Sequence, residues 1–427
     1  MTSDARDRPS PVERRARAAV AALFLTNGAL LANLVPRFPQ IKADLGMDTT
    51  VYGLTVAAFP AGAIAAGLAA AIVIRRFGSA RSAVAGTALT GLGLLTAALA
   101  PSSAAFAAAL FAAGAMDAIT DVAQNAHGLR VQRRYGRSII NSFHAVWSIG
   151  AVLGGSMAAG AIALDVPPDA HLGIAAALFS LVSFVALRFC LPGRDDEPVG
   201  DPAPGDEGPR APRGSAVTPG VVLLVAALVL IAIGGTIVED AGSSWATLYL
   251  SADLRAATAL AATGYIALVG AQFVGRLIGD RLVDRFGQRA VARAGGLVVA
   301  AGMGLALALP TVPGTIAGFA AAGLGVATLV PAAMHEADRL PGLRAGTGLT
   351  LVSWLMRLGF LLSPPLVGLV ADSAGLRAGL LVVPAAGVLV VVLAGVLPPR
   401  HRPRAQEPDP RPRKEAASAG GSESASR

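Results

Sequence analysis

Three polar residues recur at helical spacing within an apolar part of the chain: Asp117, Asp121 and Asn125. Residues four positions apart share one face of a helix, so the two carboxylates would lie one turn apart. An ionised side chain at the centre of a bilayer costs about 2.5 to 3.5 kcal/mol, and such groups face a cavity or a partner. Two neighbouring carboxylates also repel each other, which favours a bound proton on one of them. The pattern indicates proton or substrate binding; the alternative is a satisfied pair, with Asp121 bonded to Arg130 or Arg133.

A second acidic pair, Glu239 and Asp240, interrupts the apolar stretch 220–249. Successive helical residues point about 100° apart, so the two carboxylates face different directions. Glu239 is farther from Trp245 and Tyr249, which we expect at the outer membrane interface, and is the better candidate for binding a proton or a cationic substrate. The alternative is that water at the outer mouth covers both carboxylates.

Arg357 stands near the middle of the stretch 347–371. An arginine too deep to reach the interface needs a carboxylate partner or an anionic substrate. The possible carboxylate partners are Asp280, Asp284 and Glu239. An ion pair with one of them would give Arg357 a structural role or a role in gating. The more specific hypothesis is that Arg357 binds an anionic group of the substrate.

His144 and Asn27 complete the candidate set. Imidazole titrates near neutral pH, so His144 could relay protons, although a packed histidine fits the sequence equally well. Asn27 could line a cavity, but asparagine inside a helical bundle often only joins two helices.

The elements that must position these residues are long and apolar. Hydrophobic residues make up 54% of the 427 residues and charged residues 15%, against roughly 25% charged in soluble proteins. A helix that crosses a bilayer needs about 20 apolar residues. Twelve stretches qualify, and they predict an all-α integral membrane protein: 18–38, 50–74, 82–100, 103–126, 139–163, 171–192, 220–249, 258–280, 290–309, 312–334, 347–371 and 377–397.

Positive charge alternates between the connecting segments. Of the 35 arginines and lysines, 27 fall in seven segments, and only four lie in the short loops between them. This asymmetry marks the cytoplasmic side and predicts a multi-pass protein of the cell (inner) membrane with both termini in the cytoplasm. It also explains the net charge of +8 without a nucleic-acid partner. The seven basic segments are 1–17, 75–81, 127–138, 193–218, 281–289, 335–346 and 398–427.

The chain contains a long internal repeat. Shifted by 209 residues, Gly78, Gly114 and Pro101 meet Gly287, Gly323 and Pro310, and Gly86, Gly93 and Gly150 also meet glycines. A repeat of this length predicts two six-helix bundles related by a pseudo-two-fold axis. The expected divisions are a cytoplasmic tail 1–17, bundles 18–192 and 220–397, a flexible proline-rich linker 193–219 and a disordered tail 398–427.

The segment Leu282–Arg289, which reads LVDRFGQR, resembles the signature cytoplasmic loop of the major facilitator superfamily. The resemblance implies that the loop is a conformational switch, pinned against neighbouring helix ends in one of two alternating-access states. Asp284, Arg285, Gly287 and Arg289 would inherit that role, while Asp280 replaces the leading glycine. The first-half copy around Arg76-Phe77-Gly78 is degenerate. Within this family the chain is distantly similar to a bacterial branch near fucose permease, and helices one, four, seven and ten would line the central cavity.

The sequence therefore predicts a monomeric secondary transporter that moves a small molecule, coupled to protons, and uses no cofactor and no metal. Neither Lys42 nor Lys414 lies in a phosphate-binding loop, which excludes ATP hydrolysis by that route. The five histidines are scattered and the chain has one cysteine, so the sequence shows no nucleophile or metal cluster of the kind that an enzyme would need. The alternatives are a drug–proton antiporter that exports a cationic amphiphile and a non-transporting membrane sensor on the same fold.

Overall fold

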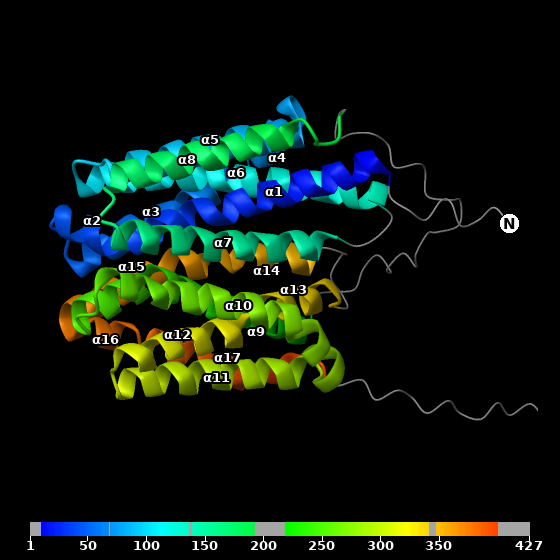
Figure 1. The fold of residues 1–427 in the computed structure, drawn as a ribbon. Helices are drawn as coiled ribbons and strands as arrows, with labels where there is room; N and C mark the ends of the chain where they lie inside the picture. Colours follow the sequence, from blue (N-terminus) through cyan, green and yellow to red (C-terminus); the bar gives the residue numbers. More distant parts are fainter. Residues whose placement is uncertain (1–9, 68, 136–138, 193–217, 341–346, 400–427) are drawn as a thin grey trace, which may run out of the picture.

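The computed structural model describes residues 10–67, 69–135, 139–192, 218–340 and 347–399, and within them it consists of helices and short connections (Figure 1). Most of the predicted tails and linker, namely residues 1–9, 193–217 and 400–427, lie outside the described residues. The predicted boundaries between tails, bundles and linker therefore remain predictions.

The first half of the chain forms one group of helices, drawn blue to green in Figure 1. A capping box at Ser10 and Glu13 starts the first helix by satisfying its free amide groups. In chain order the elements are α1 (Pro11–Leu34), η1 (Val35–Arg37), α2 (Phe38–Asp44), α3 (Thr49–Gly67), α4 (Ala70–Phe77), α5 (Ser79–Ala98), α6 (Ser103–Tyr135), α7 (Ile140–Ala163) and α8 (Pro168–Leu187).

The second half forms a second group, drawn green to red, that lies beside the first. Its elements are α9 (Pro219–Leu248), η2 (Tyr249–Asp253), α10 (Thr258–Phe286), α11 (Gln288–Ala308), α12 (Val312–Val326), α13 (Leu329–Asp338), α14 (Thr347–Leu355), α15 (Arg357–Ala374), α16 (Leu376–Gly379), α17 (Val382–Leu393) and η3 (Ala394–Val396). We call the end where α1 and α9 begin the proximal end and the opposite end, with α2 and α16, the distal end.

All twelve predicted apolar stretches correspond to helices in the described residues, and eleven helical segments are long and apolar enough to cross a membrane. The one that falls short is α5, which has 20 residues. Every 18-residue segment of α5 includes Arg81, and its serines and threonines lower the hydropathy further. The helix nevertheless packs along α6 and α8 as a full member of its bundle.

The internal repeat is visible in the packing. A methyl group on Gly114 would overlap the carbonyl group of Phe59, where α6 crosses α3. A methyl group on Gly323 would overlap the carbonyl group of Leu268, where α12 crosses α10. The two carbonyl positions are related by the same 209-residue shift as the two glycines. Absence of a side chain therefore allows the same close helix crossing in each half.

The loop that resembles the family signature is also repeated. Gly78 has φ +83° and Gly287 has φ +85°, a backbone conformation that favours glycine. The preceding side chains match as well: the guanidinium of Arg76 lies 5.5 Å from the ring centre of Phe77, and that of Arg285 lies 5.4 Å from Phe286. The backbone of the degenerate first copy is thus retained.

The two halves contact each other closely along α3 and α15 near the distal end. Gly53 lies against the carbonyl group of Pro364, and Gly368 against that of Thr49. The carboxylate of Asp372 accepts hydrogen bonds from the amide of Thr49 at 3.0 Å and that of Thr50 at 2.9 Å, and another from the Thr49 hydroxyl. An acid from one half therefore caps a helix of the other half.

One prediction about the membrane interface is wrong. Trp245 and Tyr249 are buried, with 0% and 1% of their surfaces exposed, because the end of α9 and the π-helical turn η2 lie inside the protein. The ring of Trp245 packs edge-on against Tyr52 of α3, with the ring centres 4.8 Å apart. Trp245 therefore joins the two halves, and both aromatic side chains are buried in the protein rather than placed against lipid.

Candidate functional site

A cavity of about 280 Å³ lies between the halves. Apolar side chains such as Leu31, Phe59 and Phe360 form most of its wall. A larger hollow, about 450 Å³, opens at the distal surface beside Arg37, and none of the predicted site residues lines it. The polar residues that line the central cavity come from six helices: Asn27, Asp117, Trp147, Glu239, Asp240, Ser243, Ser244, Tyr265 and Arg357.

Asp117 is held in the cavity wall by a short polar chain. The side-chain amide of Asn27, on α1, donates to Asp117 Oδ1 at 2.7 Å. The indole of Trp147, on α7, donates to Asn27 Oδ1 at 2.9 Å, which fixes the orientation of the amide. Three helices thus converge on one carboxylate, and its second oxygen is left available for a proton or a substrate donor.

Asp121 and Asn125 lie one and two turns farther along α6 and do not line the cavity. Asp121 Oδ1 accepts from the amide of Asn125 at 3.0 Å and from that of Gln124 at 3.4 Å. The alternative pairing with Arg130 is not formed, since that guanidinium donates to the carbonyl of Pro192 at 2.5 Å. The structure therefore separates the acidic pair into a cavity residue and a residue satisfied by its own helix.

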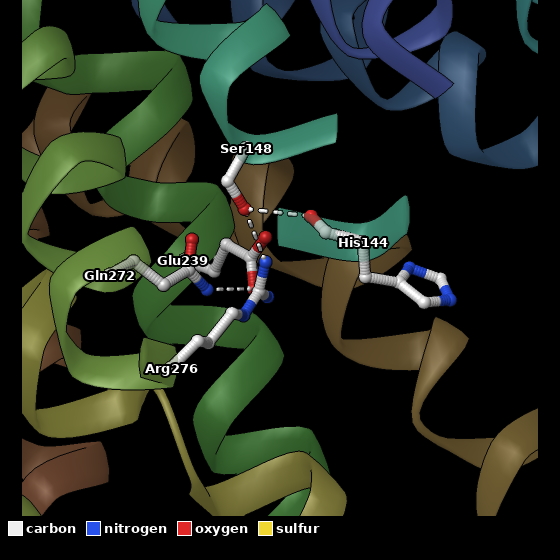
Figure 2. A network of polar contacts seen from close by, with 5 residues as sticks. All are labelled: His144, Ser148, Glu239, Gln272 and Arg276. Carbon is white, nitrogen blue, oxygen red and sulfur yellow. Dashed lines mark hydrogen bonds and ion pairs between the residues drawn. The ribbon is translucent and has the colours of Figure 1, made fainter. Parts of the chain in front are cut away.

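Glu239 belongs to a network that joins the halves (Figure 2). Gln272 donates to Glu239 Oε2 at 2.8 Å, and Arg276 Nη2 lies 4.0 Å from the same oxygen. Arg276 Nη1 also donates to the hydroxyl oxygen of Ser148 on α7 at 3.2 Å. The charge of Glu239 is therefore matched within the protein, and the matching cation reaches across to the first half.

His144 lies next to this network without joining it through its ring (Figure 2). Its carbonyl accepts from Ser148, while the ring points away and stacks edge-on against Phe24 at 5.2 Å between ring centres. The side chain is exposed, and its charge acts on Asp121. His144 is thus placed near one member of the predicted carboxylate pair, outside the cavity wall.

Asp240, the neighbour of Glu239, has very different surroundings. Ser244 donates to Asp240 Oδ1 at 3.5 Å. Its other oxygen, Oδ2, is buried and has no hydrogen-bond partner in the described parts of the chain. The residue also lines the cavity between the halves.

Arg357 lines the cavity at the start of α15. Its charge acts on Asp117 and Asp121, and within the described residues it makes no ion pair or hydrogen bond. Of the predicted partners, Glu239 is matched by Arg276, Asp284 is exposed, and the side chain of Asp280 lies outside the described residues. A guanidinium in a cavity wall with unmatched donors can bind a substrate anion.

The signature loop is only partly engaged. Arg289 donates to the carbonyl of Leu397 at 2.8 Å, which ties the start of α11 to the end of the last helix. Gly287 is buried at the turn, while Asp284 and Arg285 are exposed. The predicted attachment to a neighbouring helix end is present for Arg289, and the two charged residues before it face outward in this conformation.

Sequence reasoning missed several residues of the site. Trp147 and Ser148 gave no signal of their own, since a single tryptophan or serine in an apolar stretch has no spacing that marks it. Arg276 could have been found, because it interrupts the apolar stretch 258–280 on the same reasoning as Arg357. Within the described residues no three histidine, cysteine or acidic side chains come together as a metal site.

Known proteins resemble this chain along most of its length. The family model of the Major Facilitator Superfamily matches residues 20–282 and 244–423. The membrane protein MosC of Rhizobium meliloti is 29% identical over 400 residues, covering 93% of this chain and 94% of that protein. The uncharacterized transporter y4wD of Sinorhizobium fredii is 30% identical over 380 residues, covering 88% of this chain and 97% of that protein.

Solved structures share the fold. The nucleoside transporter NupG superposes with a TM-score of 0.68 at 12% identity, covering 90% of this chain and 98% of that chain. A D-xylose–proton symporter superposes with a TM-score of 0.66 at 16% identity, covering 90% and 96%. Two repeated bundles, a cavity between them, the repeated glycine turn and these matches lead to one conclusion: the chain is a member of the major facilitator superfamily, a non-enzymatic multi-pass membrane transporter.

Proposed function

We propose that the protein moves a small molecule by alternating access around the central cavity, coupled to protons, in the inner membrane with both termini in the cytoplasm. The observation that carries this proposal is the cavity itself. It lies between two bundles that can tilt past each other, and it holds the carboxylate of Asp117 and the unpaired guanidinium of Arg357. Asp240 and Glu239 also line the cavity, and carboxylates in such a place can take up a proton, which is the chemistry that coupling needs.

The lining also favours a substrate class. Its volume of about 280 Å³ is at the lower end of ligand sites, which fits a small metabolite. Acids on both halves and one arginine suit a zwitterion, whose carboxylate would contact Arg357 and whose ammonium would contact Asp117. A cationic amphiphile is the second candidate, because the mostly apolar walls would accept a hydrocarbon body.

Transport by purified protein in proteoliposomes tests the proposal. The vesicles enclose a pH-sensitive dye, and small zwitterions such as amino acids and betaines are added outside, with hydrophobic amines as the second set. We expect at least one zwitterion to cause a proton flux that Asp117→Asn abolishes. A flux with the hydrophobic amines alone would favour the cationic amphiphile. A protein that binds such solutes in a thermal-shift assay but never moves them would be a sensor, and the proposal would be wrong.

A further inference from the structure

Two adjacent acids on α9 have opposite surroundings. Glu239 is matched by Gln272 and Arg276 (Figure 2). Asp240 has one buried oxygen, Oδ2, with no hydrogen-bond partner in the described parts of the chain, and the polar groups beside the carboxylate are two serine hydroxyls, that of Ser244 at 3.5 Å from Oδ1 and that of Ser363. The sequence favours Glu239 for proton binding, but in the structure the unmatched carboxylate is that of Asp240.

Asp240 lies where three helices from both halves meet near the distal contact. Ser244, which donates to Asp240, accepts through its own carbonyl from the Tyr52 hydroxyl of α3 at 2.5 Å. Ser363 of α15 lies beside the carboxylate, and its hydroxyl donates to the carbonyl of Ile237 at 3.4 Å. Tilting of the halves that parts α3 from α9 would separate these groups and admit water to Asp240.

The other charged groups around α9 do not supply a counter-charge. Glu239 is the charged residue that acts on Asp240, and it repels a negative charge there. Arg357 acts on Asp117 and Asp121 instead. Helices α12, α14 and α17 carry no titratable side chain. The titratable residues with described side chains on the other elements around α9 are Arg37 of η1, Lys42 and Asp44 of α2, Tyr52 of α3, Tyr249 and Asp253 of η2, Tyr265, Arg276, Arg281, Asp284 and Arg285 of α10, His335 and Glu336 of α13, and Asp372 of α15.

A buried carboxylate with an unsatisfied oxygen is unstable when ionised, because burial removes its hydration and nothing replaces it. A proton on Oδ2 would remove the charge and with it the cost of burying an ionised group. When the distal end opens, water can hydrate the ionised form. Protonation and closure of the distal end therefore favour each other, by linkage.

We propose that Asp240, rather than Glu239, carries the coupled proton, taking it from water at the open distal side and holding it while that side is closed. The proton leaves through the central cavity, which Asp240 also lines. This inference rests on the proposed proton-coupled transport, and it names the carboxylate whose protonation permits the halves to close at the distal end.

The test measures closure of the distal end as a function of pH. Exposed Ala43 of α2 and Ala374 of α15 are replaced by cysteines for spin labels, after Cys190→Ser removes the native thiol. Double electron–electron resonance on the full chain in nanodiscs then gives the distance across the distal contact. We expect the short distance at pH 5.5 and a growing population of the long distance by pH 8.5.

Three variants separate the two acids. Asp240→Asn, which resembles the protonated form, should keep the short distance at every pH. Glu239→Gln should retain the pH response, because the proton is not held on that carboxylate. Asp240→Glu should restore the response if Asp240→Asn folds poorly, as judged by gel filtration.

The proposal is overturned if Asp240→Asn responds to pH like the parent, if Glu239→Gln loses the response, or if the parent distance does not depend on pH. The proteoliposome assay distinguishes this failure from failure of the proposed function. A protein that couples solute to proton flux but passes none of the distance tests would remain a transporter with a different proton-binding residue.

Discussion

The two halves of this transporter share the same packing but no longer carry the same polar residues. Gly114 and Gly323 hold equivalent helix crossings against equivalent carbonyl groups. The residue three positions after each glycine differs completely: Asp117 lines the cavity from α6, whereas its equivalent Val326 is buried in α12. A close helix crossing requires glycine in both halves of the protein. The cavity between the halves is shared, so each binding group is needed in one half only.

Removing the charge of Asp117 should have the largest effect. Asp117→Asn should lower transport about 100-fold, because roughly 3 kcal/mol is lost when one member of a buried charged set is neutralised. The equivalent Val326→Ala should transport within about twofold and lose about 1 kcal/mol of stability through the missing methyl groups. Initial rates of solute-dependent proton flux measure the first effect, and thermal unfolding measures the second.

The control for this comparison is Asp169→Asn, which makes the same change at an exposed position in the first turn of α8. It should transport normally. Equal losses in Asp117→Asn and Val326→Ala would break the comparison, since chemistry would then be shared by the two copies.

The packing glycines should be equally sensitive in the two halves. Gly114→Ala and Gly323→Ala should each destabilise the protein by about 1 to 3 kcal/mol, because the added methyl group has no room. Gly304→Ala is the control, since nothing lies within 4 Å of a methyl group there. Unfolding in detergent by heat measures all three. A large difference between Gly114→Ala and Gly323→Ala would show that the halves have diverged in packing too.

The distal cap should have a smaller effect. Asp372→Asn weakens the hydrogen bonds to the start of α3, so we expect a shift of no more than roughly fivefold towards the open distal end. The spin-labelled pair described above measures this population. Asp44→Asn, an exposed acid on α2 near the same end, should leave the distance unchanged. An unchanged distance in Asp372→Asn would mean that the glycine contacts alone close this end.

The smallest effect is expected at the polar link between α7 and α10. Ser148→Ala removes the hydroxyl that accepts from Arg276, a loss of about 0.5 to 1 kcal/mol, since Glu239 still contacts the guanidinium. Transport should fall by no more than about fivefold. A loss as large as that of Asp117→Asn would place Ser148 in the binding machinery itself.

Hydrophobicity made the helices predictable, and spacing made part of the site predictable. Asp117, Glu239, Arg357 and Asn27 all line the cavity, because a polar side chain inside a bilayer has few other stable positions. The sequence could not separate Glu239 from Asp240, since the difference lies in Gln272 and Arg276, which another helix supplies. The hydrogen-bond and ion-pair partners of a side chain often come from distant segments, and a local sequence pattern does not show which segments lie together in the fold.

The misplacement of Trp245 has a similar origin. Aromatic residues at the end of an apolar stretch usually mark the lipid interface, but the partner here is Tyr52 from the other half. Spacing placed Asp117 and Asp121 near each other, and the charge of Asp121 acts on Asp117 as that spacing predicts. The spacing could not show that Asn27 of another helix binds Asp117 while Asn125 of the same helix binds Asp121.

Arg81 has a consequence for the depth of α5 in the bilayer. Residues 82–100 contain no charged side chain, so they can cross the hydrocarbon region by themselves, while Arg81 is exposed at the start of the helix. A guanidinium stays at the polar interface, so this residue resists movement of α5 along the membrane normal. Through the contacts of α5 with α6 and α8, one charge would hold three crossings at the same depth.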